Sequence, residues 1–200
     1  FTTDLGGANA VGPASHMMLK TYALSDQVSY PWFAPAGTRR GGISNATAVG
    51  YIDALSGEFQ TVALNEGTRD VLYDLKVNPI PFFVGVGLVA YGQKTRARNA
   101  SALDRVNVAR LVVYLRSQLT KLARPYVFEP NDSITRDEIK GAVESLLLEL
   151  VGLRALYDFA VVCDESNNTP SRVDRNELYV DIAIEPVKAV EFIYIPVRIK

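Results

Sequence analysis

Cysteine and histidine are almost absent from the sequence. Cys163 and His16 are the single representatives of their types. One cysteine excludes a disulfide within the chain and is typical of a reducing compartment. Zinc and iron centres need several such ligands at regular spacing, so none is expected. A Cys–His catalytic pair is formally available, but His16 lies in a weakly patterned stretch, and a buried structural cysteine is the simpler interpretation.

An excess of charge and a long apolar run are also missing. The formal net charge is −1 at pH 7, which gives no global indication of a nucleic-acid or membrane partner. The apolar run over residues 80–92 is too short and too rich in glycine to span a bilayer, and no signal peptide is apparent. The chain begins with Phe1 rather than methionine, which suggests that sequence upstream is missing.

Other motifs of binding or catalysis are incomplete. Gly85–Gly87 lacks the third glycine of a dinucleotide loop and is better explained as a bend in a strand. Asn99–Ser101 matches a glycosylation acceptor without a secretory context. Three carboxylates flank one predicted strand end and could bind a cation, although a solvated sheet edge is the simpler interpretation: Asp158, Asp164 and Glu165. No catalytic, cofactor-binding or metal-binding residue is therefore predicted, and no cofactor is expected.

What the sequence does contain is an ordinary globular composition and two strong helix patterns. Hydrophobic residues make up 48% of the 200 residues, enough for a sizeable core. Apolar residues recur at spacings of three and four over residues 102–123 and 136–154, and Thr135–Glu138 forms a capping box before the second helix. The stripes are Val108, Leu111, Val112, Leu115, Leu119 and Leu122, then Ile139, Val143, Leu146, Leu147, Leu150 and Leu153, with Leu115, Leu119, Leu146 and Leu150 expected in the core.

Strand patterns follow the helices. Alternating apolar residues predict strands over Tyr157–Asp164, Glu177–Glu185 and Val190–Ile195, with a polar loop over residues 165–176. Two helices followed by three strands indicate an α+β (mixed α/β) fold, in which a mixed β-sheet is packed by the two long amphipathic helices and the chain termini form extended arms.

The first hundred residues are less clearly patterned. Residues 1–30 show little periodicity, and Leu5–Ser15 is small, glycine-rich and predicted to be loop or linker. A short helix is expected over Thr68–Lys76 with Thr68 as its N-cap. Short strands are expected over Phe82–Val84 and Leu88–Tyr91.

Two surfaces suggest contact with other molecules. On the first long helix, Arg110, Lys121 and Arg124 are predicted to lie opposite the apolar stripe, which fits a solvated face, an acidic protein surface or, less well, DNA. At the end of the chain, apolar residues alternate in a strand that either completes its own sheet or pairs with a neighbour. Its residues include Ile193, Tyr194, Ile195, Val197 and Ile199.

Several segments occur in a recognisable order. They are WFAPAG (32–37), LYDLKVNPI (72–80), YGQKT (91–95), DRVNVARL (104–111), FEPND (128–132), VVCDESNNTPSRVDRNEL (161–178) and IEPVKAVEFI (184–193). Together they resemble the C-terminal domain of tail sheath proteins from contractile-tailed bacteriophages, over Tyr30 to Ile195. Contractile bacteriocins and related injection systems carry similar domains, but NNTPSRVDRNE (167–177) is more similar to the phage branch.

The resemblance implies an organisation and a role. Residues 1–29 would be an N-terminal arm, linker or loop region, residues 30–195 the sheath C-terminal domain, and residues 196–200 the tip of a C-terminal arm. The protein would be a structural subunit, with no enzymatic activity, that polymerises around the tail tube and contracts to drive the tube through the host envelope. Arg110, Lys121 and Arg124 would face the tube, and the terminal strand would pair between subunits.

Partners follow from the same resemblance. They would be further copies in a helical or stacked-ring assembly, the tail tube protein, and the baseplate and tail terminator proteins, without direct nucleic-acid contact or membrane insertion. The protein would belong to the virion and assemble in the host bacterial cytoplasm. The alternatives are a sheath subunit of a phage-like injection system or bacteriocin, another component of a contractile machine, or an α/β enzyme of unknown substrate.

Overall fold

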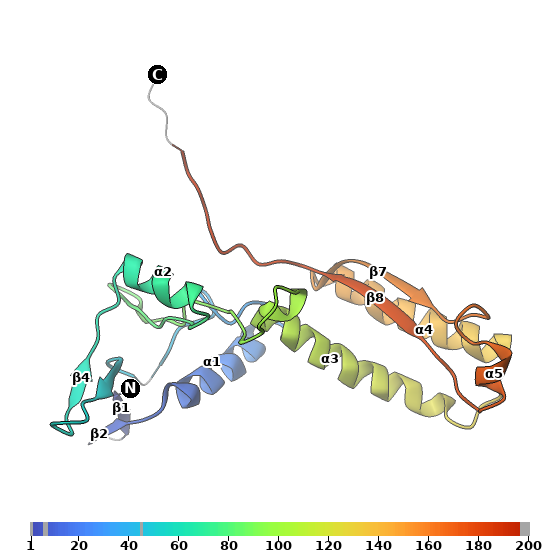
Figure 1. Cartoon of the computed structure of the whole chain (residues 1–200), viewed down its shortest axis with the longest axis horizontal. Helices are drawn as coiled ribbons and strands as arrows, with labels where there is room; N and C mark the ends of the chain where they lie inside the picture. The colour runs from blue at the N-terminus through green and yellow to red at the C-terminus, as the bar shows by residue number, and fades with distance from the viewer. Residues whose placement is uncertain (1, 6–7, 45, 197–200) are drawn as a thin grey trace. The chain divides into compact units, whose positions relative to one another are not determined.

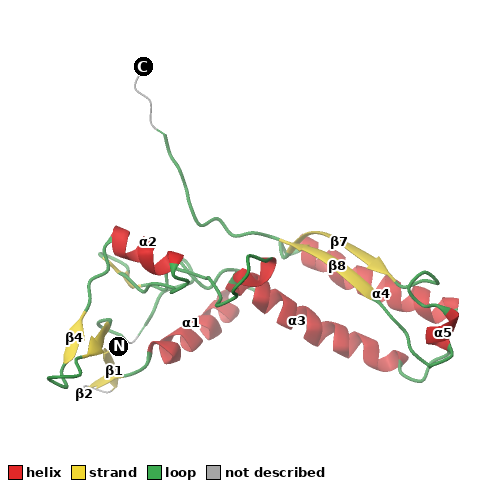
Figure 2. Cartoon of the chain, viewed as in Figure 1, coloured by secondary structure: helices red, strands yellow, loops and turns green. Residues whose placement is uncertain are grey.

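The structure is a computed structural model that describes residues 2–5, 8–44 and 46–196. The chain divides into two compact units, one ending at Arg110 and the other beginning at Leu111. Helices and small antiparallel sheets make up both units (Figures 1 and 2), so the predicted α+β class is confirmed. Within the described ranges no helix combines the length and the apolar character that crossing a bilayer requires.

The described part of the first unit is built from short hairpins and helices. A cluster of buried apolar side chains around Met17, Ile43, Ile80 and Leu88 forms its core. The elements are β1 (Thr2–Leu5) paired with β2 (Ala8–Val11), α1 (Ala14–Val28), β3 (Gly50–Ile52) paired with β4 (Phe59–Thr61), α2 (Glu66–Asp74), β5 (Phe82–Phe83) paired with β6 (Gly87–Leu88), the 3-10 turn η1 (Ala102–Asp104) and the start of α3 (Val106–Ala123).

Helix α1 lies within residues 1–30, where the sequence shows little periodicity. Its buried face consists of Met17, Thr21 and Ser25, and the hydroxyl of Thr21 donates to the backbone oxygen of Met17 at 3.0 Å. Small polar residues therefore occupy the positions where an amphipathic helix normally carries leucine or valine. The apolar periodicity that predicts a helix is absent, and β2 likewise lies within the stretch predicted to be loop.

In helices α2 and α4 (Ser133–Gly152) the N-cap lies three residues before the threonine that was predicted as the cap. Helix α2 begins after Asn65, whose side chain accepts from the N–H of Thr68 at 2.8 Å. Helix α4 begins after Asp132, whose side chain accepts from the N–H of Thr135 at 2.9 Å. Both threonines occupy the third helical position, so predicting them as caps was wrong. Asn and Asp are the stronger N-cap residues, and each helix starts at the better acceptor.

The glycine-rich segment forms the turn of a hairpin. Gly85 and Gly87 have φ values of 80° and 93°, in the left-handed region that glycine adopts without strain. The N–H of Val86 donates to the oxygen of Phe83 at 3.1 Å, which closes the turn between β5 and β6. The prediction of a bend is confirmed, and the segment does not have the strand–loop–helix context of a dinucleotide site.

The second unit contains a helix packed on a two-stranded sheet. Strand β7 (Leu156–Val162) pairs antiparallel with β8 (Asp181–Pro186), and α4 lies along β7 (Figure 1). The 3-10 turn η2 (Arg124–Tyr126) follows α3, and the short helix α5 (Pro170–Val173) lies between the strands in sequence. Among the described residues the sheet is therefore antiparallel rather than mixed, and close helix packing on it is shown for α4 only. The prediction that Val190–Ile195 adds a third strand is wrong.

The predicted core is half right. Leu115 and Leu150 are buried, with 5% and 1% exposure, whereas Leu119 and Leu146 are only half-buried. On α4, Leu147 is the fully buried neighbour in place of Leu146. A three-to-four spacing defines a helix face, but it leaves adjacent members of a leucine run ambiguous.

Candidate assembly surfaces

The C-terminal segment is the first candidate surface. After β8 the chain continues without helix or strand through Pro196 (Figure 1). Its apolar side chains are largely exposed, including Ile193 at 77%, Tyr194 at 87% and Ile195 at 78%. Val187, just after β8, still donates to the oxygen of Ala155 at 3.0 Å. An exposed apolar segment of this kind is a candidate interaction site.

The predicted intersubunit strand is therefore only partly described. Val197 and Ile199 lie outside the described residues. The described members, Ile193 to Ile195, are available for contact with another molecule.

The β7–β8 sheet is the second candidate surface. It has two strands, so within residues 2–5, 8–44 and 46–196 each strand keeps one edge that no other strand pairs. Unpaired N–H and C=O groups at an edge are a template for strand addition. Phe159 faces Ile184 across the ladder, and Asp158 faces Glu185. Like charges directly opposite one another weaken pairing.

The predicted acidic residues do not form a cation site. Asp158 lies on β7, while Asp164 accepts from the hydroxyl and the N–H of Ser166, and these bonds lower the pKa of its carboxyl. Glu165 is exposed in the following turn. Within the described ranges no three histidine, cysteine or acidic side chains are grouped to hold a metal. The arrangement fits a turn that is stabilised by its own hydrogen bonds.

Two asparagines that the sequence did not single out fix the loop between β7 and β8. The side-chain amide of Asn167 donates to the oxygen of Val162 at 2.8 Å and to the carboxylate of Asp181 at 2.9 Å. Asn168 accepts from the N–H of Tyr179 at 2.7 Å and donates to the oxygen of Tyr179 at 2.9 Å. Both asparagines are buried. The sequence carries no sign of this, because the residues around them in the loop are also polar or small. They hold the entry of β8 against the end of β7.

The burial of Cys163 does not suit a nucleophilic role. Cys163 is fully buried, and burial raises the pKa of its thiol, opposite to what a thiolate nucleophile needs. His16 is exposed on α1 in the other unit. The structural interpretation of Cys163 fits its burial.

Arg110 differs from the other cations predicted to face a partner. Its Nη2 donates to both carboxylate oxygens of Asp26 on α1, at 2.6 Å to Oδ1 and 2.5 Å to Oδ2. Its guanidinium also lies 5.3 Å from the ring centroid of Tyr22, and the Arg110 side chain is only 21% exposed. Burial raises the pKa of Tyr22, against the opposing effect of Arg110. The structure therefore assigns Arg110 a partner within its own unit.

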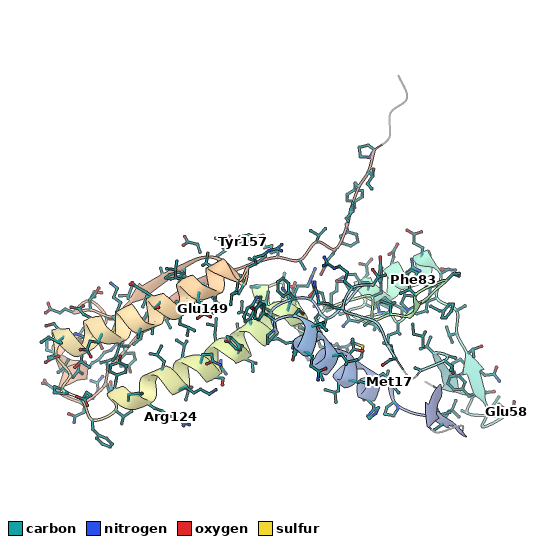
Figure 3. The ribbon with its side chains drawn as sticks, turned by 180° about the vertical axis from the view of Figure 1, so that it is seen from behind. Met17, Glu58, Phe83, Arg124, Glu149 and Tyr157 are labelled. Carbon is teal, nitrogen blue, oxygen red and sulfur yellow. The ribbon has the colours of Figure 1, made fainter. Side chains whose placement is uncertain are left out.

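Lys121 and Arg124 lie on a continuous exposed stripe of α3 and η2. They line a shallow groove of about 390 Å³, and Arg124 lies just beyond the C-terminal end of α3 (Figure 3). We call this surface the α3 stripe; its residues are Val113, Arg116, Ser117, Thr120, Lys121 and Arg124. Helix α3 contains no acidic residue, so the stripe is basic without an internal counter-charge. Arg116 belongs to the same surface.

Sequence comparisons relate the chain to tail sheath proteins. The family described as phage tail sheath C-terminal domain matches residues 98–200. The tail sheath protein of Vibrio phage KVP40 is 40% identical over 171 residues, covering 86% of this chain and 24% of that protein. The tail sheath protein of Enterobacteria phage T4 is 33% identical over the same shares. The chain thus spans about a quarter of the length of these relatives.

Solved structures show the same fold at lower identity. The anti-feeding prophage helical sheath in its contracted state has a TM-score of 0.79 at 21% identity, covering 98% of this chain and 53% of that chain. The sheath complex of the extracellular contractile injection system PVC, also contracted, has a TM-score of 0.77 at 20% identity over the same shares.

Proposed function

The chain belongs to the phage tail sheath family, and we propose that it is the part of a sheath subunit that joins copies into a helical or stacked-ring assembly around a tail tube. The observation that carries the proposal is the family match over residues 98–200. Contraction of the assembly would drive the tube through the host envelope. The work would come from changes in subunit contacts, without nucleotide hydrolysis, which fits a structural rather than an enzymatic role.

Strand exchange is the proposed joint between copies. The exposed segment from Val190 to Ile195 of one copy adds to an open edge of the β7–β8 sheet of another. Each added ladder hydrogen bond contributes about 0.5–1.5 kcal/mol net, and each buried aliphatic side chain about 1.5–3 kcal/mol. Val197 and Ile199 would extend this contact. Because the donor strand and the acceptor edge are different surfaces, the contact is heterologous and can build either a closed ring or an open helical polymer.

The α3 stripe is the proposed contact with the tube. Its cations fit an acidic protein surface through steering and charge pairing. Arg110, which the sequence analysis grouped with Lys121 and Arg124, is bound to Asp26, so the proposed contact relies on Arg116, Lys121 and Arg124. Baseplate and terminator proteins at the ends of the polymer complete the set of proposed partners, in a virion assembled in the host bacterial cytoplasm.

A sheath of an injection system is the second candidate. The similarity of fold to the anti-feeding prophage and PVC sheaths favours it, and the curated phage relatives favour the first. Both candidates share the joint and the contractile role, and they differ in what the tube delivers.

Removal of residues 196–200 tests the joint. We expect the truncated chain to keep its circular dichroism spectrum and to lose polymers in sedimentation and electron microscopy. A second variant, Ile193→Asp with Ile195→Asp, removes the apolar contact without shortening the chain. Val86→Asp, at an exposed position in the β5–β6 turn, is the matched control and should polymerise normally. Loss of fold on truncation would show that the segment is internal, and normal polymers from both variants would exclude it as the joint.

A further inference from the structure

The turn between α3 and α4 presents a fully exposed aromatic ring. Phe128 has a relative exposure of 101%, beside Val127 at 59%. Ile134, on the first turn of α4, is 67% exposed. A single exposed apolar side chain is common on protein surfaces and needs no explanation. The backbone beneath Phe128 is what makes the position unusual.

Phe128 occupies a backbone position that normally takes glycine. The N–H of Glu129 donates to the oxygen of Tyr126 at 3.2 Å, closing a four-residue turn. Val127 has φ −70° and ψ 125°, and Phe128 has φ 77°, which are the angles of a type II turn. The third position of such a turn requires positive φ and is usually Gly or Asn. An aromatic residue there is strained, so this turn combines a backbone cost with an unburied ring.

Phe128 follows the α3 stripe closely in the sequence. Arg124 is the last residue of the stripe and the first residue of the 3-10 turn η2, and Phe128 comes shortly after that turn. The acidic residues Glu129 and Asp132 follow Phe128 on the α4 side. They would repel a partner of negative charge, so such a partner is expected to approach the ring from the basic α3 side. Interfaces commonly place an aromatic anchor beside a rim of charged groups, where the anchor supplies binding energy and the rim sets orientation.

We propose that Phe128 is the apolar anchor of the contact made by the α3 stripe. Its ring enters an apolar recess in an acidic protein surface, that of the tail tube. The inference rests on the proposed tube contact and adds a specificity-determining residue to it. The strained turn holds the ring outward in the free subunit, so the ring is oriented for binding before contact.

Phe128→Gly separates binding from folding. Glycine relaxes the turn and removes the ring, so we expect the melting temperature to stay level or rise while affinity for assembled tail tubes falls about tenfold or more. Cosedimentation of the chain with tubes measures affinity. Arg154→Gly is the matched control, because Arg154 is exposed and has φ 62° just after α4. It should relieve strain in the same way and leave tube binding unchanged. Phe128→Leu should retain part of the affinity.

Salt dependence distinguishes the anchor from the stripe. Reversal of Lys121 and Arg124 to Glu should flatten the fall of affinity with salt, whereas Phe128→Gly should lower affinity without changing that slope. If the charge reversal weakens binding and Phe128→Gly does not, the tube contact stands and the anchor is overturned. If neither change weakens binding, both fail. If Phe128→Gly impairs polymerisation without tubes as strongly as tube binding, the partner is a second copy and the proposal is overturned.

Discussion

Arg110 on α3 and Asp26 on α1 form an ion pair in which one guanidinium nitrogen reaches both carboxylate oxygens. The two residues are 84 positions apart in sequence. The pair fixes the first turns of α3 against α1 within the first unit, and it neutralises a cation that would otherwise extend the basic surface. Arg110 is therefore paired within the first unit, whereas Lys121, on the same helix, belongs to the exposed α3 stripe.

Arg110→Ala should lower stability and leave partner binding intact. Loss of the ion pair and of the contact with Tyr22 removes about 1–2 kcal/mol from the free energy of unfolding, measured by denaturant titration. The double variant Lys121→Glu with Arg124→Glu should change the free energy of unfolding by less than about 0.5 kcal/mol. It should, however, weaken cosedimentation with tubes at low salt. Equal tube affinity of the reversed and unaltered chains at low and moderate salt would contradict the role of the stripe.

Leu150 and Leu148 offer a matched test of the α4 packing. Leu150 is 1% exposed and Leu148 is 65% exposed on the same helix. Leu150→Ala should cost about 2–5 kcal/mol, because the cavity adds to the lost burial, whereas Leu148→Ala should change stability by less than about 0.5 kcal/mol. Thermal and denaturant unfolding measure both. Similar melting temperatures for the two variants would rule out this packing.

Asn168 should be the most sensitive position of the loop before β8. Asn168→Ala leaves the backbone N–H of Tyr179 without its side-chain acceptor, and the Tyr179 oxygen keeps only the longer hydrogen bond from Asn167, at 3.2 Å. We expect a loss of about 1–3 kcal/mol in unfolding free energy. Asn168→Asp still accepts from Tyr179 but cannot donate, so it should also destabilise. Glu165→Ala, exposed in the same loop, is the control. A neutral Asn168→Ala would mean that the loop is held by other contacts.

Asp132 should contribute to acid sensitivity. The hydrogen bond from the N–H of Thr135 lowers the pKa of its carboxyl. Because the folded pKa is the lower one, the stabilisation is present above the unfolded value of about 3.9 and is lost as the pH falls through the folded value. Asp132→Asn, which still caps the helix, should flatten the unfolding profile between about pH 5 and pH 2. Asp132→Ala should lower the melting temperature at neutral pH as well.

The acid profile should flatten only in part. Asp164 and Glu177 also have lowered pKa values, caused first by hydrogen bonds from the side chains of Ser166 and Arg175. They keep part of the dependence in the Asp132→Asn variant. An unchanged profile for Asp132→Asn would show that the cap carries no charge-dependent stabilisation.

Periodicity predicted the long elements of the second unit well. The helices α3 and α4 and the strand β7 follow from apolar spacing, because each buries one face. Strand β8 begins at Asp181 rather than Glu177, since the backbone of Tyr179 is bound by Asn168 before the ladder starts. Such side-chain bonds to the backbone do not alter the apolar pattern.

The features that escaped prediction depend on contacts between distant residues. Helix α1 buries Thr21 and Ser25, so its inner face has no hydrophobic signature. The capture of Arg110 by Asp26 needs the tertiary arrangement of two helices. The strain at Phe128 is equally invisible, because a type II turn is normally predicted from a glycine. Which predicted cations remain exposed is therefore decided by tertiary contacts and not by their spacing along the helix.

The open ladder of the β7–β8 sheet also bears on how the subunit responds to dilution. A two-stranded sheet is marginal by itself and is supported here by packing against α4. Amide protons on the outer edges lack ladder partners and should exchange with solvent quickly in the free chain. When a neighbour supplies a strand, mass action links that protection to subunit concentration. The melting temperature then becomes a property of the protein solution rather than of the single chain.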